Sequence, residues 1–428
     1  MNDRAPRGLF EGVRILELGQ YVAVPYCAEL FAHGGADVIK IEPVTGDETR
    51  FNSPIIPGEG RQYIIKARGK RGLPVNLGTE AGRALARRIA LGCDVVLSNI
   101  RPGGVEQLGL DYDALAAQNP RLVYGEINAF GRRGPEGDKP AIDPVVQAAS
   151  GMIVAGRGSE DGRPVPNEAM LGDYMAGTLL AFGVTAALRE RDRTGRGQKV
   201  STTLMQAMLA LQHASANVFH AVDGWKHELV EWIADARPPY AEAFARRRQS
   251  IATGHYWVNT YETADGYVTV GAPAQLRRRL AKVLGMDDPA LSDPNWEMPD
   301  DPRPYMAAVT AQARARAKQF QTDDLVRALE AEGVPCSRVR FLEEVMLGEH
   351  AAANEFVYTA DHPKVGPMTL PSAPVRFSEA RYAAADDSPA YGEHTFELLR
   401  ALGLDEKEIE SLVASGVVGI EGGLQRRT

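Results

Sequence analysis

The sequence predicts an α/β protein whose mostly parallel sheet is covered by helices on both faces. Three observations support this prediction. Short apolar runs alternate with helical patterns through the first half of the chain. The first two runs flank one helix and form a β-α-β unit of about thirty residues. The second half holds a hairpin followed by helices, which predicts a separate, smaller α/β domain.

The first β-α-β unit opens the chain. It comprises a strand at 13–18 (V-R-I-L-E-L), a helix at 26–33 that Gly34-Gly35 stops, and a second strand at 36–42. The loop at 19–25 follows the first strand, and open α/β sheets bind ligands at the carboxyl ends of their strands. No G-x-G-x-x-G follows this strand, so the dinucleotide-binding fingerprint is absent.

The same alternation continues to about residue 220. We expect strands at 94–98, 122–127 and 197–204, and helices at 79–91, 112–118, 141–151 and 205–220. Between them, residues 174–188 have the length and composition of a buried helix. A charged run at 189–193 is expected to end that helix.

The chain changes character after Gly224. Residues 225–253 contain no glycine and are interpreted as a linker with helical pieces, which carries the basic cluster Arg246-Arg247-Arg248. The smaller domain is expected to contain a hairpin at 256–272 that turns at Ala264-Asp265-Gly266, then helices at 274–285, 302–318 and 322–332. Short strands, including one at 374–377, and a helix that ends at Leu402 close the chain.

Length and composition limit the possible classes of function. A chain of 428 residues suggests two to three domains or one large domain with an excursion. The net charge of −8 gives no electrostatic footprint for nucleic acid. Three widely spaced cysteines argue against a disulfide framework and a zinc site. The N-terminus has no apolar signal core, and the apolar run at 174–188 is too short to span a bilayer, so we expect a cytoplasmic protein without membrane contact.

The stretch 170–177 (M-L-G-D-Y-M-A-G) holds the first candidate for catalysis. Asp173 is expected at or next to the N-cap of the apolar helix, where the helix dipole and free N–H groups favour an ionised carboxylate. The small neighbours Gly172, Ala176 and Gly177 would let a substrate approach, so Asp173 could act as a nucleophile. The alternative is a purely structural N-cap, the more common role of such an aspartate.

Other catalytic motifs are missing. The sequence has no H-E-x-x-H, no Walker loop and no G-x-S-x-G. The eight histidines show no metal-ligand spacing, and His394 is interpreted as a surface or packing residue.

Several stretches together make the chain resemble the family III CoA-transferases, also called the CaiB/BaiF family. The shared stretches are the opening L-x-G-V-R-I-L-E-L, A-D-V-I-K-I-E-P at 36–43 with Gly46-Asp47, Lys70-Arg71, N-I-R-P-G at 99–103, Gly131 to Gly134-Pro135, Q-A-A-S-G at 147–151, L-G-D at 171–173, T-G-R-G-Q at 194–198, G-V-P-C at 333–336 and G-E-H-T at 392–395.

The resemblance implies an architecture. It implies a large Rossmann-like domain from both chain ends (1–222 and 375–428) and a smaller α/β domain at 256–330, joined by linkers at 223–255 and 331–374. Two subunits would interlock like links of a chain. We expect a homodimer, with pairing to a related subunit as the alternative.

The resemblance also implies a mechanism and a site. Asp173 would attack an acyl-CoA thioester to form a mixed anhydride, and CoA would return to give an aspartyl-CoA thioester that an incoming acid resolves. No metal or organic cofactor beyond coenzyme A is expected. The residues implied in binding CoA or the substrate are Gln20, Val22, Ala23, Lys70, Arg71, Arg101, Gln107, Leu108 and Asp143, and the cations Lys70 and Arg71 are expected to meet CoA phosphates unless they form a solvated basic turn.

Two departures from the family pattern bear on the substrate. Residues 225–253 lack the glycine run of the formyl-CoA:oxalate members, which argues against formate or oxalate. Ile142 stands where the acyl-CoA racemases carry histidine, and isoleucine cannot move a proton. The leading hypothesis is therefore a CoA-transferase with succinyl-CoA as the expected donor. The alternatives are an α-methylacyl-CoA racemase and a non-catalytic subunit of a two-chain transferase.

Overall fold

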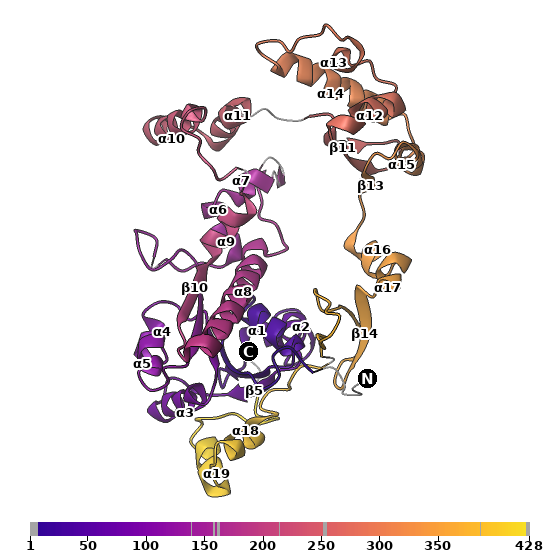
Figure 1. Cartoon of the computed structure of the whole chain (residues 1–428). Helices are drawn as coiled ribbons and strands as arrows, with labels where there is room; N and C mark the ends of the chain where they lie inside the picture. The colour runs from indigo at the N-terminus through magenta and orange to yellow at the C-terminus, as the bar shows by residue number, and fades with distance from the viewer. Residues whose placement is uncertain are drawn as a thin grey trace. The chain divides into compact units, whose positions relative to one another are not determined.

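The computed structural model describes residues 7–137, 139–156, 159–160, 163–213, 215–250, 255–385 and 387–424. The chain divides into two compact units. Unit 1 combines Met1–Asn217 with Glu349–Thr428, and unit 2 is Val218–Gly348. Most of the helices and some of the strands are labelled in Figure 1. The predicted limits of the two linkers stay predictions.

Unit 1 is built on a six-stranded parallel sheet, as the sequence predicts. Its strand order is β10-β7-β6-β1-β2-β5, and every neighbouring pair is parallel. The strands are β1 (Arg14–Leu18), β2 (Asp37–Glu42), β5 (Arg71–Pro74), β6 (Val95–Ser98), β7 (Val123–Asn128) and β10 (Lys199–Thr203). Four of them begin and end within one residue of the predicted strands. β10 is shorter than the strand predicted at 197–204, and β5 has no predicted counterpart.

Two apolar layers cover the sheet because successive side chains of a strand point to opposite faces. Ile15 packs with α1 (Ala23–His33), α8 (Leu171–Thr194) and α9 (Leu204–Leu211). Leu16 packs on the other face with α3 (Glu80–Leu91), α5 (Tyr112–Ala116), α18 (Thr395–Ala401) and α19 (Glu406–Ala414). The sheet is therefore buried on both sides, and only its ends are open to ligands.

Helix α8 corrects one boundary of the sequence analysis. It runs for 24 residues through the charged segment that was expected to stop it, and Gly195 in the left-handed conformation ends it. Arg191 reaches Asp94 at 2.8 Å and Arg193 reaches Glu190 at 3.0 Å, so the charges are accommodated within the helix. By length and composition alone α8 could cross a membrane, but its buried residues belong to the apolar core around β7 and β10.

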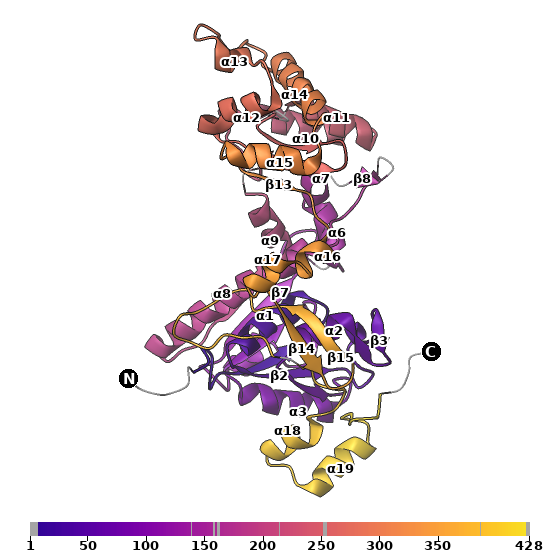
Figure 2. The ribbon, with the colours of Figure 1, turned by 90° about the vertical axis from the view of Figure 1, so that its right-hand side faces the viewer.

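The C-terminal segment completes unit 1. The hairpin of β14 (Val357–His362) and β15 (Gly366–Pro371) lies beside α2 (Arg61–Ala67) in Figures 1 and 2, and Arg68 donates to the Tyr358 hydroxyl at 2.6 Å. The predicted strand at 374–377 is wrong, since those residues form no ladder. The hairpin just before it and helix α19 were not predicted. Val75 and Val418 form an antiparallel bridge that ties the C-terminus to the sheet.

Unit 2 contains the predicted hairpin. Strands β11 (Val258–Glu262) and β12 (Tyr267–Gly271) pair antiparallel, and β13 (Cys336–Arg338) joins β12. Helices α12 (Arg277–Leu284), α14 (Arg303–Ala317) and α15 (Thr322–Ala331) cover this sheet around a separate core. The expected linker is largely two helices, α10 (Gly224–Ala236) and α11 (Tyr240–Ser250), and the arginine cluster lies on α11.

The remaining elements are short. They are η1 (Glu48–Arg50), β3 (Pro54–Ile56), β4 (Glu59–Gly60), α4 (Gly104–Gln107), α6 (Asp143–Ala149), α7 (Met152–Gly156), β8 (Ser159–Glu160), β9 (Arg163–Pro164), η2 (Ala274–Leu276), α13 (Pro289–Ser292), α16 (Leu342–Met346) and α17 (Glu349–Ala353). Helix α9 is also shorter than the helix expected at 205–220.

Candidate active site

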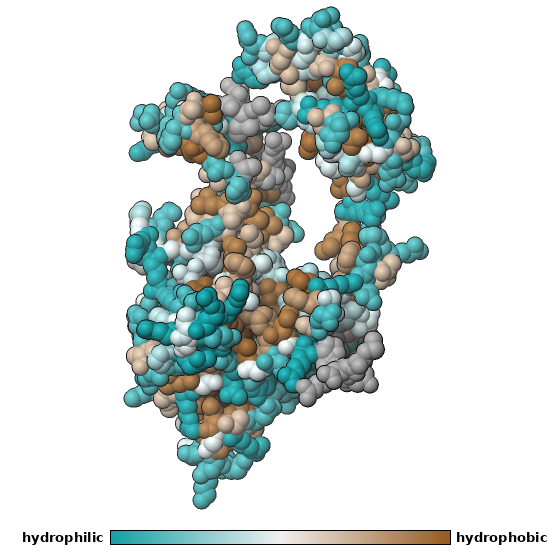
Figure 3. Space-filling model, viewed as in Figure 1, coloured by the Kyte–Doolittle hydropathy of each residue, from teal (hydrophilic) through white to brown (hydrophobic). Residues whose placement is uncertain are grey.

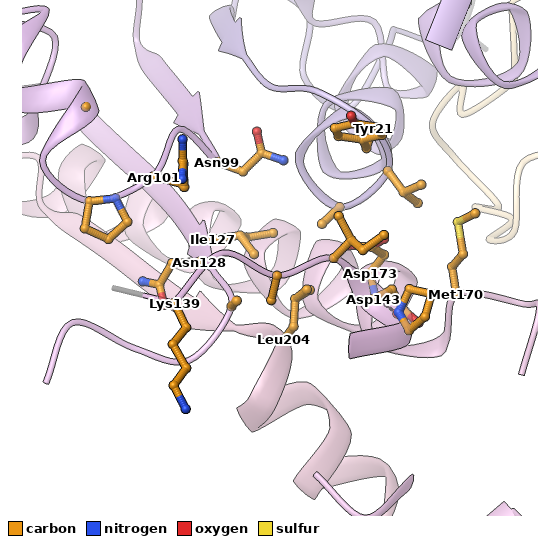
Figure 4. A pocket seen from close by; sticks show the side chains of 18 of the residues that line it. Tyr21, Asn99, Arg101, Ile127, Asn128, Lys139, Asp143, Met170, Asp173 and Leu204 are labelled. Atoms are coloured by element: carbon orange, nitrogen blue, oxygen red, sulfur yellow. Dashed lines mark hydrogen bonds between the residues drawn. The ribbon is translucent and has the colours of Figure 1, made fainter. Parts of the chain in front are cut away.

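A cavity of about 590 Å³ opens at the carboxyl ends of β1, β6 and β7. The loop after β1, the loop after β6, the end of β7 and the N-terminus of α8 form its walls (Figure 4). Its labelled lining residues are Tyr21, Asn99, Arg101, Ile127, Asn128, Lys139, Asp143, Met170, Asp173 and Leu204. A second cavity of about 1070 Å³ continues along the ends of β2 and β5 and shares Tyr21, Asn99 and Arg101 with the first. A long, two-part ligand would fit such a pair of connected hollows.

Asp173 lies in the first cavity, in the first turn of α8. It is the third helical residue, because the N-cap is Met170, whereas the sequence placed Asp173 at or next to the N-cap. Met170 adopts a left-handed conformation with φ of 49°, which is costly for a residue with a side chain and is often found at functional sites. The described residues place no hydrogen-bond donor on either carboxylate oxygen of Asp173. Both carboxylate oxygens therefore remain available to a ligand in the cavity.

Asp143 and Gln147 on α6 hold the turn that carries Asp173. Asp143 is buried, and its Oδ2 accepts the backbone N–H of Asp173 at 2.9 Å. Its Oδ1 accepts from the Gln147 amide at 2.6 Å. The Gln147 side chain also binds the backbone of Asn167. Its Nε2 donates to the Asn167 carbonyl, and its Oε1 accepts from the Asn167 N–H, both at 2.8 Å. The sequence assigned Asp143 to substrate binding. In the structure both of its carboxylate oxygens instead accept hydrogen bonds that hold the first turn of α8 in place.

The pKa of the Asp173 carboxyl is raised to about 7. Burial is the main cause, the neighbouring Asp143 carboxylate adds to it, and the positive charge of Lys66 opposes it. The apolar side chains of Ile127 and Leu204 in the same cavity keep water from solvating the charge. A poorly solvated carboxylate that titrates near neutral pH is a better nucleophile than one in water.

Helix α1 approaches α8 closely behind this cavity. A side chain at Gly177 would place its Cβ 2.6 Å from the Ala23 carbonyl oxygen, so only glycine fits there. This contact sets Val22 and Ala23, two predicted site residues, into the cavity wall beside Asp173.

The loop between β1 and α1 is fixed at both ends by buried charges. The Lys40 ammonium donates to the Gly19 carbonyl at 2.7 Å, and the Lys70 ammonium donates to the Pro25 carbonyl at 2.8 Å. Glu17 lies between these lysines and accepts from each, at 2.9 and 2.7 Å. The prediction that Lys70 meets a CoA phosphate is therefore wrong in this structure, because its ammonium is buried and already bound.

Side-chain contacts also shape the middle of this loop. Gln20 exchanges two hydrogen bonds with the Asn99 side chain, at 3.0 and 2.9 Å, which joins the loops after β1 and β6. Tyr21 adopts a left-handed conformation with φ of 63°, and its hydroxyl donates to Glu48 at 2.6 Å. Gln20 lines the second cavity, as a ligand-binding role requires.

The other predicted site residues divide into two groups. Arg101 lines both cavities and Gln107 lines the first. Arg71 instead pairs with Asp37 at 2.6 Å and with Glu397 at 2.8 Å, so its prediction as a phosphate contact is wrong here. Leu108 packs against the apolar layer of α3 and α5 and lines neither cavity.

Sequence reasoning missed several residues of the site. Asn99 belongs to the N-I-R-P-G stretch but is not among the predicted site residues, although a polar residue directly after a parallel strand is typical of such a site. Met170 and Gln147 gave no local signal, because their roles depend on conformation and on a contact twenty residues away. Lys66 also gave none, since burial of a lysine on a short helix cannot be read from its neighbours in sequence.

Comparisons with known proteins agree with this architecture. A model of CoA-transferase family III matches residues 10–395. The succinyl-CoA–D-citramalate CoA-transferase of Chloroflexus aurantiacus is 29% identical over 422 residues, covering 97% of this chain and 100% of that protein. The formyl-CoA:oxalate CoA-transferase of Streptomyces avermitilis is 29% identical over 417 residues, covering 95% and 99%. A crystal structure of a CaiB/BaiF family protein from Brucella suis matches with a TM-score of 0.70 and 27% identity, over 92% of this chain and all of that one.

Proposed function

The chain belongs to CoA-transferase family III, whose members move CoA between an acyl-CoA and a carboxylic acid, and we propose that Asp173 is its covalent nucleophile. The observation that carries the proposal is the Asp173 carboxylate itself. It lies in the cavity, poorly solvated and without a structural hydrogen bond among the described residues. Desolvation and fixed position are the conditions under which a carboxylate attacks a thioester.

The proposed cycle needs no proton transfer. An oxygen of Asp173 attacks the thioester carbon, the C–S bond breaks, and a mixed anhydride and CoA thiolate result. The thiolate attacks the aspartyl carbonyl, releases the first acid as a carboxylate and leaves an aspartyl-CoA thioester. The acceptor carboxylate then attacks the carbonyl of the aspartyl-CoA thioester, the C–S bond breaks, and a second anhydride and CoA thiolate result. The thiolate attacks the acyl carbon of the acceptor in this anhydride. This step yields the new acyl-CoA and restores the Asp173 carboxylate.

The oxyanion of each tetrahedral intermediate requires hydrogen-bond donors. The first turn of α8 offers backbone N–H groups and the positive end of the helix dipole close to Asp173. These donors are fixed before the reaction starts, because Asp143 and Gln147 hold the turn. The chain's own groups therefore suffice for the chemistry, and we propose no metal or organic cofactor beyond coenzyme A.

We place the CoA moiety across the two connected cavities. Their shared wall contains Arg101, whose guanidinium suits a phosphate. The thioester would then lie at Asp173 and the nucleotide along the ends of β2 and β5. Gln20, Val22, Ala23 and Gln107 line these walls and remain the proposed CoA contacts.

We propose succinyl-CoA as the donor. The Chloroflexus aurantiacus relative is named for that donor, and residues 225–253 lack a glycine run. A racemase is not favoured, because Ile142 on the cavity wall is apolar and cannot move a proton.

We also propose a homodimer. Hydrophobic surface is visible in the region of α8 and α9 in Figure 3. The exposed apolar residues of these helices include Phe182 (74% exposed), Leu209 (45%) and Leu211 (45%). A second copy of the chain would remove this apolar surface from water.

Replacement of Asp173 by alanine tests the mechanism. We expect Asp173→Ala to fold and to lose transfer activity by several orders of magnitude, because both oxygens of Asp143, the other carboxylate that lines the cavity, are already bound by the Asp173 N–H and the Gln147 amide. Intact-mass measurement after incubation with succinyl-CoA and hydroxylamine should show a hydroxamate on the wild type and none on the variant. Near-normal turnover by Asp173→Ala would refute covalent catalysis at this residue.

A further inference from the structure

Lys66 is a buried lysine that neither the fold nor the proposed mechanism accounts for. It lies on α2, and only 5% of its surface is exposed. Among the described residues no acceptor lies within hydrogen-bonding distance of its ammonium. A buried charge without a partner destabilises a fold, so it persists where another requirement maintains it.

The position of Lys66 relates it to the active site. Gln62 lies one helical turn earlier on α2 and lines the cavity around Asp173. Residues four apart share one face of a helix, so Lys66 lies on the face of α2 that looks toward the cavity. Lys66 and Tyr21 together line a hollow of about 10 Å³, and Tyr21 also belongs to the cavity wall. That volume admits about one water molecule and no carboxylic acid.

The carboxylates around Lys66 are mostly paired with other cations. Glu29 on α1 pairs with Arg68 at 2.8 Å, and Asp47 pairs with Lys40 at 2.9 Å. Both still lie in the electrostatic field of Lys66, as does the Lys70 ammonium. Neither acid depends on Lys66 for its counter-charge.

Asp173 also lies in the electrostatic field of Lys66, and no cation among the described residues forms an ion pair with its carboxylate. The Asp143 carboxylate on α6 faces it with a like charge, and Lys66 is the cation that acts on it. Tyr26 and Tyr174, in edge contact beside it, stay neutral because burial raises the pKa of each hydroxyl. Lys66 and Asp173 thus form a pair of opposite charges that act through space.

On the premise of the proposed function, we infer that Lys66 is a positioning residue that keeps the Asp173 carboxylate ionised and ready to attack the acyl-CoA. Burial lowers the pKa of Lys66, and the negative charges of Glu29 and Asp173 oppose this. The inferred role requires the protonated ammonium and transfers no proton, so it adds no step to the cycle. Its charge offsets the repulsion by Asp143 and the poor solvation of the cavity. Because the pair is separated, Asp173 gains electrostatic support without a hydrogen bond that would have to break before attack.

The test is the pH dependence of kcat/KM for the acyl-CoA donor, which reports ionisations of the free enzyme. Lys66→Met removes the charge and keeps most of the volume. Without the cation the carboxylate holds its proton more tightly, so the acid limb moves to higher pH. We expect kcat/KM at pH 6 to fall about tenfold relative to wild type, an effect of one pKa unit, while the plateau at high pH changes little.

Three controls make the result specific. Lys66→Arg keeps the charge, so the acid limb of its kcat/KM profile should lie near the same pH as in wild type. Lys139 also lines the cavity, but its ammonium points away from Asp173 in Figure 4 and pairs with Glu136 at 2.9 Å. Lys139→Met should therefore leave the limb in place, whatever it does to the maximal rate. Asp173→Ala tests the underlying mechanism separately.

Thermal unfolding separates this role from a structural one. Removing an unpaired buried charge should leave the melting temperature of Lys66→Met equal to or above that of wild type. An acid limb that stays at the wild-type pH in Lys66→Met, while Asp173→Ala is inactive, would overturn the inference and leave the mechanism intact. A destabilised Lys66→Met with an equal loss of rate at every pH would also overturn it, because that result describes a packing residue.

Discussion

Replacing Asp173 by asparagine is expected to abolish transfer and, at pH 8, to make the protein harder to unfold. Asparagine has nearly the same size but carries no charge. The pKa of the Asp173 carboxyl is about 7 in the folded protein and about 3.9 in an unfolded chain. Between these pH values the unfolded chain releases the proton first, so the free energy of unfolding of wild type falls as the pH rises. Above pH 7 the wild type has lost all of this stability, so the difference in free energy of unfolding between Asp173→Asn and wild type is largest there.

The size of the gain follows from the shift. About three pKa units at 1.36 kcal/mol each give an upper limit of about 4 kcal/mol. Asp173 is only partly buried and faces an open cavity, so solvent screening reduces this, and we expect about 2 kcal/mol at pH 8. At pH 5 the stability gain of Asp173→Asn should be less than half as large, because pH 5 lies in the lower part of the range between the unfolded and folded pKa values.

Urea unfolding at pH 5 and pH 8 measures both values, at one fixed protein concentration because association affects apparent stability. Asp113 is a matched control, since it is an exposed aspartate in the first turn of another helix of unit 1. Asp113→Asn should change stability little and equally at both pH values. If Asp173→Asn is no more stable than wild type at pH 8, the carboxylate is well solvated and our account of its reactivity is wrong.

Two further predictions concern assembly and the acceptor acid. We expect a dimer that does not dissociate on dilution, since two interlocked chains would have to unfold to separate; a folded monomer that appears at low concentration in sedimentation would contradict this. If the arginine cluster on α11 holds a second carboxylate, Arg247→Ala should raise KM for a dicarboxylic acid about tenfold, from one charge-assisted contact worth ~1.5–3 kcal/mol, and leave a monocarboxylic acid unaffected. Arg246 stacks on Trp232, with 4.3 Å from its guanidinium carbon to the ring centroid. Equal kinetics of all three alanine variants with both acids would show that the cluster does not bind the acceptor.

The sheet was predictable because its signals are local. Apolar runs such as residues 13–18 and the glycine pair after α1 define a β-α-β unit without reference to the rest of the chain. The length of α8 was not predictable in this way, because a charged run ends a helix only if its charges lack partners. Here Asp94, about a hundred residues earlier in the chain, accepts Arg191.

The site shows the same division. Its small neighbours and the adjoining apolar helix made Asp173 a candidate, and the resemblance to the CoA-transferases implied its role as nucleophile. The errors at Lys70 and Arg71 arose because both cations are bound by acids distant in sequence, Glu17 at a separation of 53 residues and Glu397 at 326. A basic pair in a sequence indicates charge, whereas its availability depends on tertiary contacts that sequence patterns do not contain.

The bridge between Val75 and Val418 has a consequence for how the chain reaches its native state. A ribosome adds about 5–20 residues per second, so unit 2 (Val218–Gly348) separates the synthesis of the two parts of unit 1 by roughly 7–26 s. During that interval the sheet face that α18 and α19 later cover, with Leu73 and Val75 on it, is without its final layer. Nascent chains of this protein should therefore be exposed to aggregation and to chaperone binding until the last helices emerge, whereas unit 2, contiguous in sequence, can fold as soon as it leaves the exit tunnel.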